Sequence, residues 1–252
     1  MSKKTIILSV IVLAAVILSA CGGAEPEPTP EPVVEAQVVE KPQLSPMEAC
    51  AQSIALPGDP AYPLLYCEDF SNMDTVLMPL GEFESKALDM NMSVYNGKYT
   101  LRANVYRDTY AYATTPGLDV RDFIMQVDGR LVSHSGHPYH SWGIVIKQDP
   151  EGKDYYYFKV DNNEYYYFMM IRGEKETNLI NGRRSEDLNP LDEGNTLTVV
   201  ATGDTYEFFI NGKYQEEFKD NRILNGNLGL FFDFGEDTIL DWEFDNLVVY
   251  AP

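Results

Sequence analysis

Short stretches in which apolar and polar residues alternate recur along most of the chain after residue 62. Alternation at every second position places one set of side chains on each face of a β-strand. The clearest examples are residues 99–105 and 121–127, and Phe123, Met125 and Val127 share one face of the second. Further strand candidates are 142–147, 155–160, 165–171, 196–201, 206–210, 228–234 and 241–249. No stretch longer than a few residues in this region keeps the 3.6-residue period of a helix, so the pattern predicts an all-β domain.

Turn signals separate these segments, including Asn96-Gly97 and Asn211-Gly212. An Asn-Gly pair accepts the positive φ angles of a type I′ turn, so a hairpin is predicted around Asn211. Roughly ten or more short strands at this spacing are typical of a two-sheet antiparallel sandwich, specifically a jelly roll.

The first residues have the layout of a secretory signal, because Lys3 and Lys4 precede an apolar run over 5–18. Residues 18–21, Leu-Ser-Ala-Cys, then resemble the lipobox of bacterial lipoproteins. The resemblance implies that residues 1–20 are a signal peptide and that Cys21 carries fatty acyl chains such as palmitate. Several chains on one cysteine would anchor the protein stably, outside the cytoplasm, to the cell membrane or outer membrane. An ordinary signal peptide or an uncleaved anchor is the alternative.

Residues 21–47 are rich in proline and glutamate, which predicts an extended, disordered tether before a domain over 48–252. The two cysteines after Cys21 are Cys50 and Cys67, which flank a Pro-rich stretch. In an exported protein this arrangement predicts a disulfide, and a catalytic cysteine is the alternative.

The charge of the chain excludes one class of partner. The sequence has 39 acidic and 19 basic residues and a formal net charge of −20. Such a surface repels nucleic acid and anionic lipid headgroups. The 44% hydrophobic content is ordinary for a folded domain.

The order of the segments resembles the concanavalin A-like lectin and glucanase jelly rolls, and in particular their laminin-G-like and 3-keto-disaccharide hydrolase-like members. The likeness spans residues 65–250. It rests on Glu-Asp-Phe-Ser at 68–71, Gly-Lys-Tyr at 97–99, Trp-Gly-Ile-Val-Ile at 142–146, Asp-Tyr-Tyr-Tyr-Phe at 154–158, Asn-Thr-Leu-Thr-Val at 195–199, Phe-Ile-Asn-Gly-Lys at 209–213, Leu-Gly-Leu-Phe at 228–231 and Phe-Asp-Asn-Leu-Val-Val at 244–249. The resemblance implies a curved sandwich whose concave face or rim meets carbohydrate, without implying catalysis.

Retaining glucanases of this superfamily carry Glu-x-Asp-x-x-Glu on one strand. Glu243 and Asp245 match the start of this motif, but Val248 occupies the place of the second glutamate. These two residues are therefore weak catalytic candidates, and a solvated polar strand face is the alternative. The resemblance also implies a structural calcium ion between the first and last strands, for which Asp69 and Asp245 are oxygen ligands of a suitable type.

All three histidines lie within one stretch, at His134, His137 and His140. Three neutral imidazoles would suit zinc, copper or nickel. However, Gly136 and Pro138 predict a loop, in which the rings are not fixed on one face and simply meet water.

Two tyrosine triplets, 155–157 and 165–167, lie on strand candidates joined by a predicted hairpin loop. Within each triplet the outer two side chains point one way and the middle one the other. The apolar continuations favour the middle tyrosines for the core. This leaves an aromatic platform for sugar rings, formed by Tyr155, Tyr157, Tyr165 and Tyr167, with Lys159, Asn162 and Asn163 nearby to donate hydrogen bonds. Trp142, at a strand start, is either a core residue or a further ligand-binding aromatic, and the tyrosines themselves are also common in half-buried strands.

These observations predict a membrane-anchored lipoprotein that binds carbohydrate. Two other functions stay open, namely a glycoside hydrolase or keto-sugar enzyme of the same superfamily, and a protein-interaction or adhesion module.

Overall fold

The computed structural model describes residues 44–252. The predicted signal peptide, Cys21 and the tether up to residue 43 lie outside these residues. The described part is mostly strand, with one α-helix, α1 (Pro46–Ser53), and one 3-10 helix, η1 (Met73–Thr75). Neither of these helices in residues 44–252 is long and apolar enough to cross a membrane.

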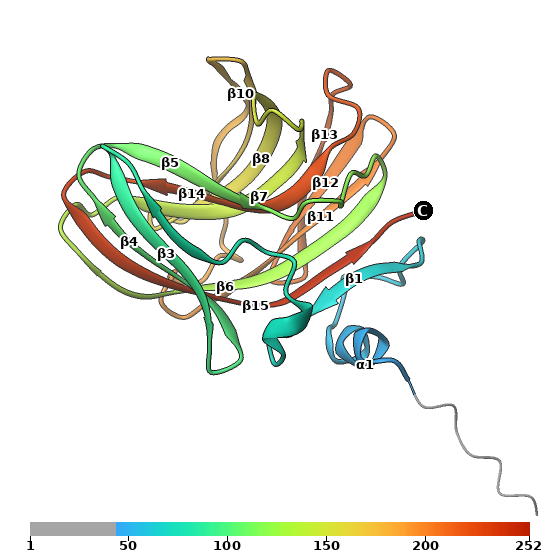
Figure 1. Cartoon of the computed structure of the whole chain (residues 1–252). Coiled ribbons are helices and arrows are strands. Elements are labelled where there is room, and N and C mark those ends of the chain that lie inside the picture. The colour runs from blue at the N-terminus through green and yellow to red at the C-terminus, as the bar shows by residue number, and fades with distance from the viewer. Residues whose placement is uncertain (1–43) are drawn as a thin grey trace, which may run out of the picture. The chain divides into compact units, whose positions relative to one another are not determined.

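Two antiparallel sheets pack face to face as a jelly-roll sandwich, which confirms the predicted fold class (Figure 1). The nine-stranded sheet has the order β13-β12-β11-β6-β15-β4-β3-β2, and β1 also pairs with β15. Its strands are β1 (Leu64–Glu68), β2 (Gly81–Glu84), β3 (Leu88–Tyr95), β4 (Lys98–Val105), β6 (Phe123–Ser135), β11 (Asn195–Thr202), β12 (Thr205–Ile210), β13 (Lys213–Lys219) and β15 (Thr238–Tyr250). The six-stranded sheet has the order β10-β9-β8-β7-β14-β5. Its strands are β5 (Thr109–Thr114), β7 (His140–Gln148), β8 (Asp154–Asp161), β9 (Tyr165–Arg172), β10 (Lys175–Arg184) and β14 (Asn227–Phe234).

The long strands β6 and β15 run side by side through the nine-stranded sheet (Figure 1). The first half of β15, from Thr238 to Phe244, pairs with β4 on its other edge. The second half, from Leu247 to Tyr250, pairs with β1. The first and last strands of the sandwich are therefore neighbours, as the resemblance implied.

The main core lies between the two sheets, because alternate residues of each strand point inward. In β4 the side chains of Tyr99, Leu101, Ala103 and Val105 are all buried, while Arg102 and Asn104 between them are exposed. The predicted hairpin between β12 and β13 is present. Its turn residues, Asn211 and Gly212, have φ angles of 52° and 74°, which a type I′ turn requires.

Helix α1 begins at a capping box, in which the Ser45 hydroxyl accepts from the Glu48 N–H and the Glu48 carboxylate accepts from the Ser45 N–H. Only one residue of this short helix, Cys50, is buried. A disulfide joins Cys50 to Cys67 on β1, with 6.0 Å between the Cα atoms. The bond therefore holds a helix with little apolar contact of its own against the edge of the sandwich.

We expect loss of this disulfide to lower the free energy of unfolding by about 2–3 kcal/mol, because the closed loop restricts the unfolded chain. Urea unfolding of a Cys50→Ala/Cys67→Ala double variant would measure the change, with the reduced wild-type protein as a matched comparison. An unchanged unfolding midpoint in both would show that the bond contributes nothing to stability.

Candidate functional site

The two tyrosine triplets lie on the neighbouring antiparallel strands β8 and β9. Tyr156 and Tyr166 belong to the main core between the sheets. Their neighbours point to the outer side of the six-stranded sheet, where they form a second apolar cluster. We call this outer side the tyrosine face; its cluster consists of Tyr112, Val145, Tyr155, Tyr157, Tyr167, Met169, Ile171 and Phe231.

The rings of the tyrosine face pack against one another rather than lying open. The rings of Tyr157 and Phe231 are parallel within 9°, with their centroids 4.0 Å apart. Phe231 can lean toward β8 because its partner on the intervening strand β7 is Gly143, which has no side chain. As a result Tyr155 and Tyr157 are only 1% exposed, and the open platform predicted for these two residues is absent from the described structure. Of the four predicted platform residues, Tyr165 is exposed and Tyr167 is half-buried.

An ion pair lies among these rings. Lys159 Nζ is 2.6 Å from Asp233 Oδ2 and 3.1 Å from the Tyr139 hydroxyl. The ammonium also lies 5.3–6.0 Å from the ring centroids of Tyr139, Tyr157, Tyr167 and Phe231. Burial alone lowers the pKa of Lys159, but the attraction and hydrogen bonds of Asp233 and Tyr139 together outweigh it and the pKa is raised. Lys159 is therefore held in its charged form.

Asp233 belongs to a row of residues that crosses the sheet. Tyr110 on β5 pairs with Asp233 on β14, which pairs with Ser141 on β7, which pairs with Asp161 on β8. The next strand begins with Tyr165, whose N–H donates to Asp161 Oδ1. We call these five residues the polar row. An exposed tyrosine stands at each end of it, since Tyr110 is 48% exposed and Tyr165 is 37% exposed.

The two carboxylates of the polar row differ in how much hydrogen-bonding capacity they have left. Asp161 accepts the N–H groups of Asn163 and Tyr165 on one oxygen and the Tyr167 hydroxyl on the other. Asp233 accepts through Oδ2 alone, and no group within residues 44–252 bonds its Oδ1. Asp161 thus fixes the β8–β9 hairpin, whereas Asp233 can accept hydrogen bonds from a ligand.

The stability of the tyrosine face depends on pH. Burial raises the pKa of Tyr155 and Tyr157 well above the usual range. Unfolded tyrosine ionises near pH 10, so above that pH the folded state binds more protons and the free energy of unfolding falls by about 1.4 kcal/mol per pH unit for each buried tyrosine. Urea unfolding between pH 9 and 11 would measure this slope. We expect a shallower slope for Tyr155→Phe and the wild-type slope for Tyr95→Phe, a site that is 66% exposed. Equal slopes for all three proteins would contradict the assignment.

Of the two roles left open for Trp142, core residue or ligand-binding aromatic, the structure shows the first. Trp142 lies on β7 with the opposite parity to Ser141 and Gly143, so its side chain points between the sheets. Its ring is fully buried and packs edge-on against Phe244, with 5.3 Å between centroids.

The three histidines occupy different environments. The rings of His134 and His140 are 4.5 Å apart, and His137 Nδ1 accepts from the Tyr139 N–H. Burial, followed by the nearby His134 and His137, lowers the pKa of His140 to about 4. Within residues 44–252 no group of three or more His, Cys, Asp or Glu side chains is arranged to hold a metal ion. The transition-metal and calcium hypotheses therefore gain no support from the described structure.

The proposed calcium ligands and the weak catalytic candidates have other partners. Asp69 accepts from the Ser71 N–H. Glu243 pairs with Arg130 at 2.7 Å, and Asp245 pairs with Lys98. Glu243 and Asp245 line a polar groove of about 590 Å³ on the nine-stranded sheet, on the opposite side of the sandwich from the tyrosine face. In the described structure these two carboxylates act as ion-pair partners.

Sequence reasoning missed Tyr110, Tyr139 and Asp233, although it named Lys159. A signal for Asp233 was present, because Phe232 and Phe234 alternate with Phe231 and Asp233 along one strand. Since Phe232 and Phe234 lie in the core, this alternation places Asp233 on the same outer face as Lys159. The contact between these two residues, which lie 74 positions apart, depends on the pairing of β14, β7 and β8.

Comparison with known proteins shows similarity at the level of structure. No family model and no curated protein sequence matches the chain. A protein of unknown function with a galectin-like fold from Bacillus subtilis is similar with a TM-score of 0.54 and 12% identity, over 75% of this chain and 96% of that one. The catalytic domain of an endo-1,3-beta-glucanase (laminarinase) from Thermotoga petrophila has a TM-score of 0.52 and 11% identity, over 76% of this chain and 98% of that one. LamA from Z. galactanivorans, in complex with laminaritriose and laminaritetraose, has a TM-score of 0.53 and 10% identity, over 76% of this chain and 100% of that one. At these identities the likeness establishes the fold, which is a two-sheet jelly roll of the concanavalin A-like kind.

Proposed function

We propose that the protein is a carbohydrate-binding module and that a saccharide chain binds along the polar row of the tyrosine face. The observation that carries this proposal is the row itself, in which exposed Tyr110 and Tyr165 stand on either side of a carboxylate with a free oxygen. Sugars present apolar C–H faces that pack on aromatic rings and hydroxyl groups that bond charged side chains. The row supplies both kinds of group.

The dimensions of the row suit an extended ligand. Strands β5 and β9 are four positions apart in the sheet, which separates the two tyrosines by about 19 Å at the usual strand spacing. Tyr139 and Lys159 add a hydroxyl and an ammonium beside Asp233. The likeness in fold to a laminarinase and to LamA with bound laminari-oligosaccharides gives the proposal further support.

A glycan array with the full chain in detergent would test this function. We expect Tyr110→Ala and Tyr165→Ala each to weaken binding about two- to tenfold, because an aromatic contact contributes about 0.5–1.5 kcal/mol beyond the area that it buries. Tyr95→Ala is the matched control, since Tyr95 is also exposed but lies at the end of β3 in the other sheet. Absence of binding to any saccharide, or equal losses in all three variants, would contradict the proposal.

We further propose that the protein is anchored outside the cytoplasm through acyl chains on Cys21. This rests on the basic start, the apolar run and the lipobox of the first 21 residues. Metabolic labelling of cells with a clickable palmitate analogue should label the wild-type protein and not Cys21→Ser. A labelled Cys21→Ser protein would contradict the assignment, and Cys50→Ser serves as the control for a cysteine outside the lipobox.

A further inference from the structure

A pocket of about 480 Å³ lies at one end of the six-stranded sheet, lined by the ends of β8, β9 and β10 and by the segment after β13. Three of its lining side chains are the cations Arg172, Lys175 and Arg222, and one is the anion Asp154. With Asp220, which pairs with Arg222, three cations meet two carboxylates, so this pocket carries an excess of one positive charge in a chain with 39 acidic and 19 basic residues.

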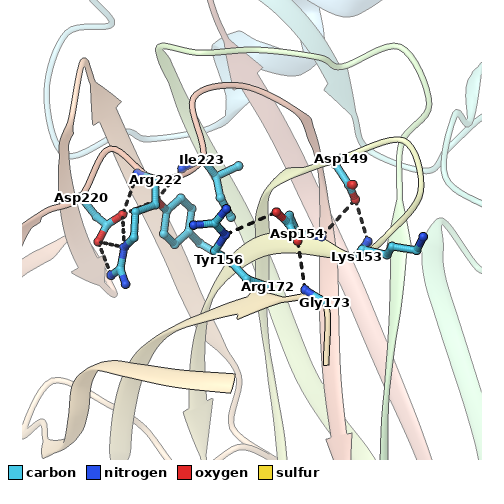
Figure 2. Close-up of polar contacts among 9 residues, drawn as sticks. All are labelled: Asp149, Lys153, Asp154, Tyr156, Arg172, Gly173, Asp220, Arg222 and Ile223. Atoms are coloured by element: carbon cyan, nitrogen blue, oxygen red, sulfur yellow. Dashed lines mark hydrogen bonds and ion pairs between the residues drawn. The ribbon is translucent and has the colours of Figure 1, made fainter. Parts of the chain in front are cut away.

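Arg222 is held firmly on one side of its guanidinium group (Figure 2). Its Nε donates to both oxygens of Asp220, and its Nη2 also bonds Oδ2. Asp220 in turn accepts from the hydroxyl of the core residue Tyr156 at 2.5 Å, and that hydroxyl accepts from the Ile223 N–H. No group in the described part of the chain bonds Nη1 of Arg222, so this nitrogen can bond a ligand.

Arg172 lies on the other side of Tyr156 in Figure 2 and is held more loosely, since its side chain is 52% exposed. Its Nε is 3.5 Å from Asp154 Oδ2, and Asp154 Oδ1 accepts from the Gly173 N–H. The two terminal nitrogens of Arg172 form no hydrogen bond within residues 44–252, and Lys175 forms no ion pair there. The pocket therefore presents the fixed guanidinium group of Arg222, a second guanidinium group beside Asp154 and one ammonium, a combination suited to a planar or tetrahedral oxyanion.

We propose that this pocket binds the carboxylate or sulfate group of an acidic saccharide. The inference rests on the proposed carbohydrate-binding function and adds a second site, separate from the polar row, because Arg172 and Thr177 share the parity of the core residues Tyr156 and Met170 rather than that of the tyrosine face. Arginine forms parallel hydrogen bonds to carboxylate and sulfate oxygens, which a neutral sugar does not offer. Thr177 and Met170 supply a hydroxyl and an apolar wall for the ring that carries the charged group. The volume lies within the range of small-molecule sites.

Calorimetric titration of the full chain in detergent would test this inference with three probes: oligogalacturonate, its methyl ester, which keeps the sugar backbone without the charge, and a sulfated oligosaccharide. We expect at least one charged probe to bind about tenfold or more tightly than the ester, and its affinity to fall as salt is added. The probe that binds identifies carboxylate or sulfate as the recognised group.

We expect Arg172→Gln, Lys175→Gln and Arg222→Gln each to weaken binding of the charged probe about tenfold. Arg102→Gln is the matched control, because Arg102 is 71% exposed and loosely paired in the other sheet. Lys175→Gln leaves the Asp154 and Asp220 contacts intact, so it reports on the pocket even where an arginine variant misfolds. Equal affinity for charged and neutral probes, or unchanged affinity in Lys175→Gln, would overturn the inference. Neutral glycans that bind through Tyr110 and Tyr165 would in that case leave the proposed function standing, whereas no binding of any saccharide would overturn both.

Discussion

Replacing Lys147 with methionine is expected to raise the free energy of unfolding at pH 7 by about 3 kcal/mol, since burial disfavours the charged form of the lysine. Lys147 is 1% exposed, and its Nζ bonds only the Tyr206 hydroxyl, at 3.0 Å. No carboxylate within residues 44–252 forms an ion pair with it. Burial accordingly lowers the pKa of Lys147 to about 8. Methionine has a similar length without the charge, so it removes this cost while filling the same space.

The pH dependence of this effect has a definite sign. Unfolded lysine titrates near pH 10.4, whereas folded Lys147 titrates near pH 8. Between these values the unfolded state binds more protons, so the Lys147 contribution makes the wild-type protein more stable as pH rises. The gain in free energy of unfolding from Lys147→Met should therefore be largest below pH 8 and vanish above about pH 10.5.

Urea unfolding of the wild type and Lys147→Met from pH 7 to 10.5 would measure the difference between their free energies of unfolding. The buried tyrosines lower the stability of both proteins equally at high pH, so their effect cancels in this difference. Lys153→Met is the control, because the Lys153 side chain is 65% exposed and pairs with Glu151 at the surface. A difference that stays constant with pH, or a variant less stable than the wild type at pH 7, would show that Lys147 is not strained by burial.

Lys147 also shows where sequence reasoning about the fold reached its limit. Residues 142–147 were predicted as a strand, and strict alternation along it would place Lys147 on the same side as Val145, away from the core. In the structure Lys147 has a φ angle of 55°, and the pairing of β7 with β14 shifts nearby, so Ile146 and Lys147 both point inward. A β-bulge of this kind reverses the parity of a strand without a sequence signal that alternation can detect.

Most of the strands that the pattern missed share a physical reason. Every strand candidate of the sequence corresponds to a strand of the structure, whereas no candidate covered β1, β2, β3, β5, β10 or β13, of which β13 was implied only as the second strand of the predicted hairpin. All of these except β3 lie at an edge of their sheet or pair with a single strand. Edge strands have exposed and often charged residues on both faces, which obscures alternation; all four residues of β2 are exposed. Helix α1 was missed because only one of its residues is buried.

For the candidate site, the sequence pattern was enough to assign side chains to faces of the sheet but not to show what surrounds them. The assignment of Tyr156 and Tyr166 to the core follows from parity together with the apolar continuations of their strands, and both lie there. Whether Tyr155 and Tyr157 are open depends instead on Phe231, which comes from a strand more than 60 residues later in the chain. The pocket lined by Arg172, Lys175 and Arg222 likewise joins β9, β10 and the segment after β13. No local sequence pattern predicts that these three segments meet.

Replacing Asp233 with asparagine is expected to lower the free energy of unfolding by about 3 kcal/mol, because it leaves the Lys159 ammonium without its counter-charge. Lys159 is 7% exposed, and its remaining contacts are the Tyr139 hydroxyl and four ring faces. This loss of stability is at the low end of the range for removing one partner of a buried ion pair, since the Asp233 side chain is 26% exposed. Adding Lys159→Met to this variant should restore most of the stability, because no buried charge then remains. Urea unfolding of the wild type, both single variants and the double variant would give the coupling energy.

This cycle separates the structural role of the pair from its role in binding. Asp241→Asn is the control, because its partner Arg102 is 3.7 Å away and largely exposed, so a change below about 0.5 kcal/mol is expected. Equal destabilisation of the Asp233→Asn single and double variants would show that the charge on Lys159 is not the cause. If the double variant regains stability but still binds saccharide weakly, with Tyr110 and Tyr165 intact, the side chain of Asp233 or Lys159 contacts the ligand directly. If it binds as the wild type does, the ion pair only supports the rings, and the tyrosines at the two ends of the polar row carry recognition.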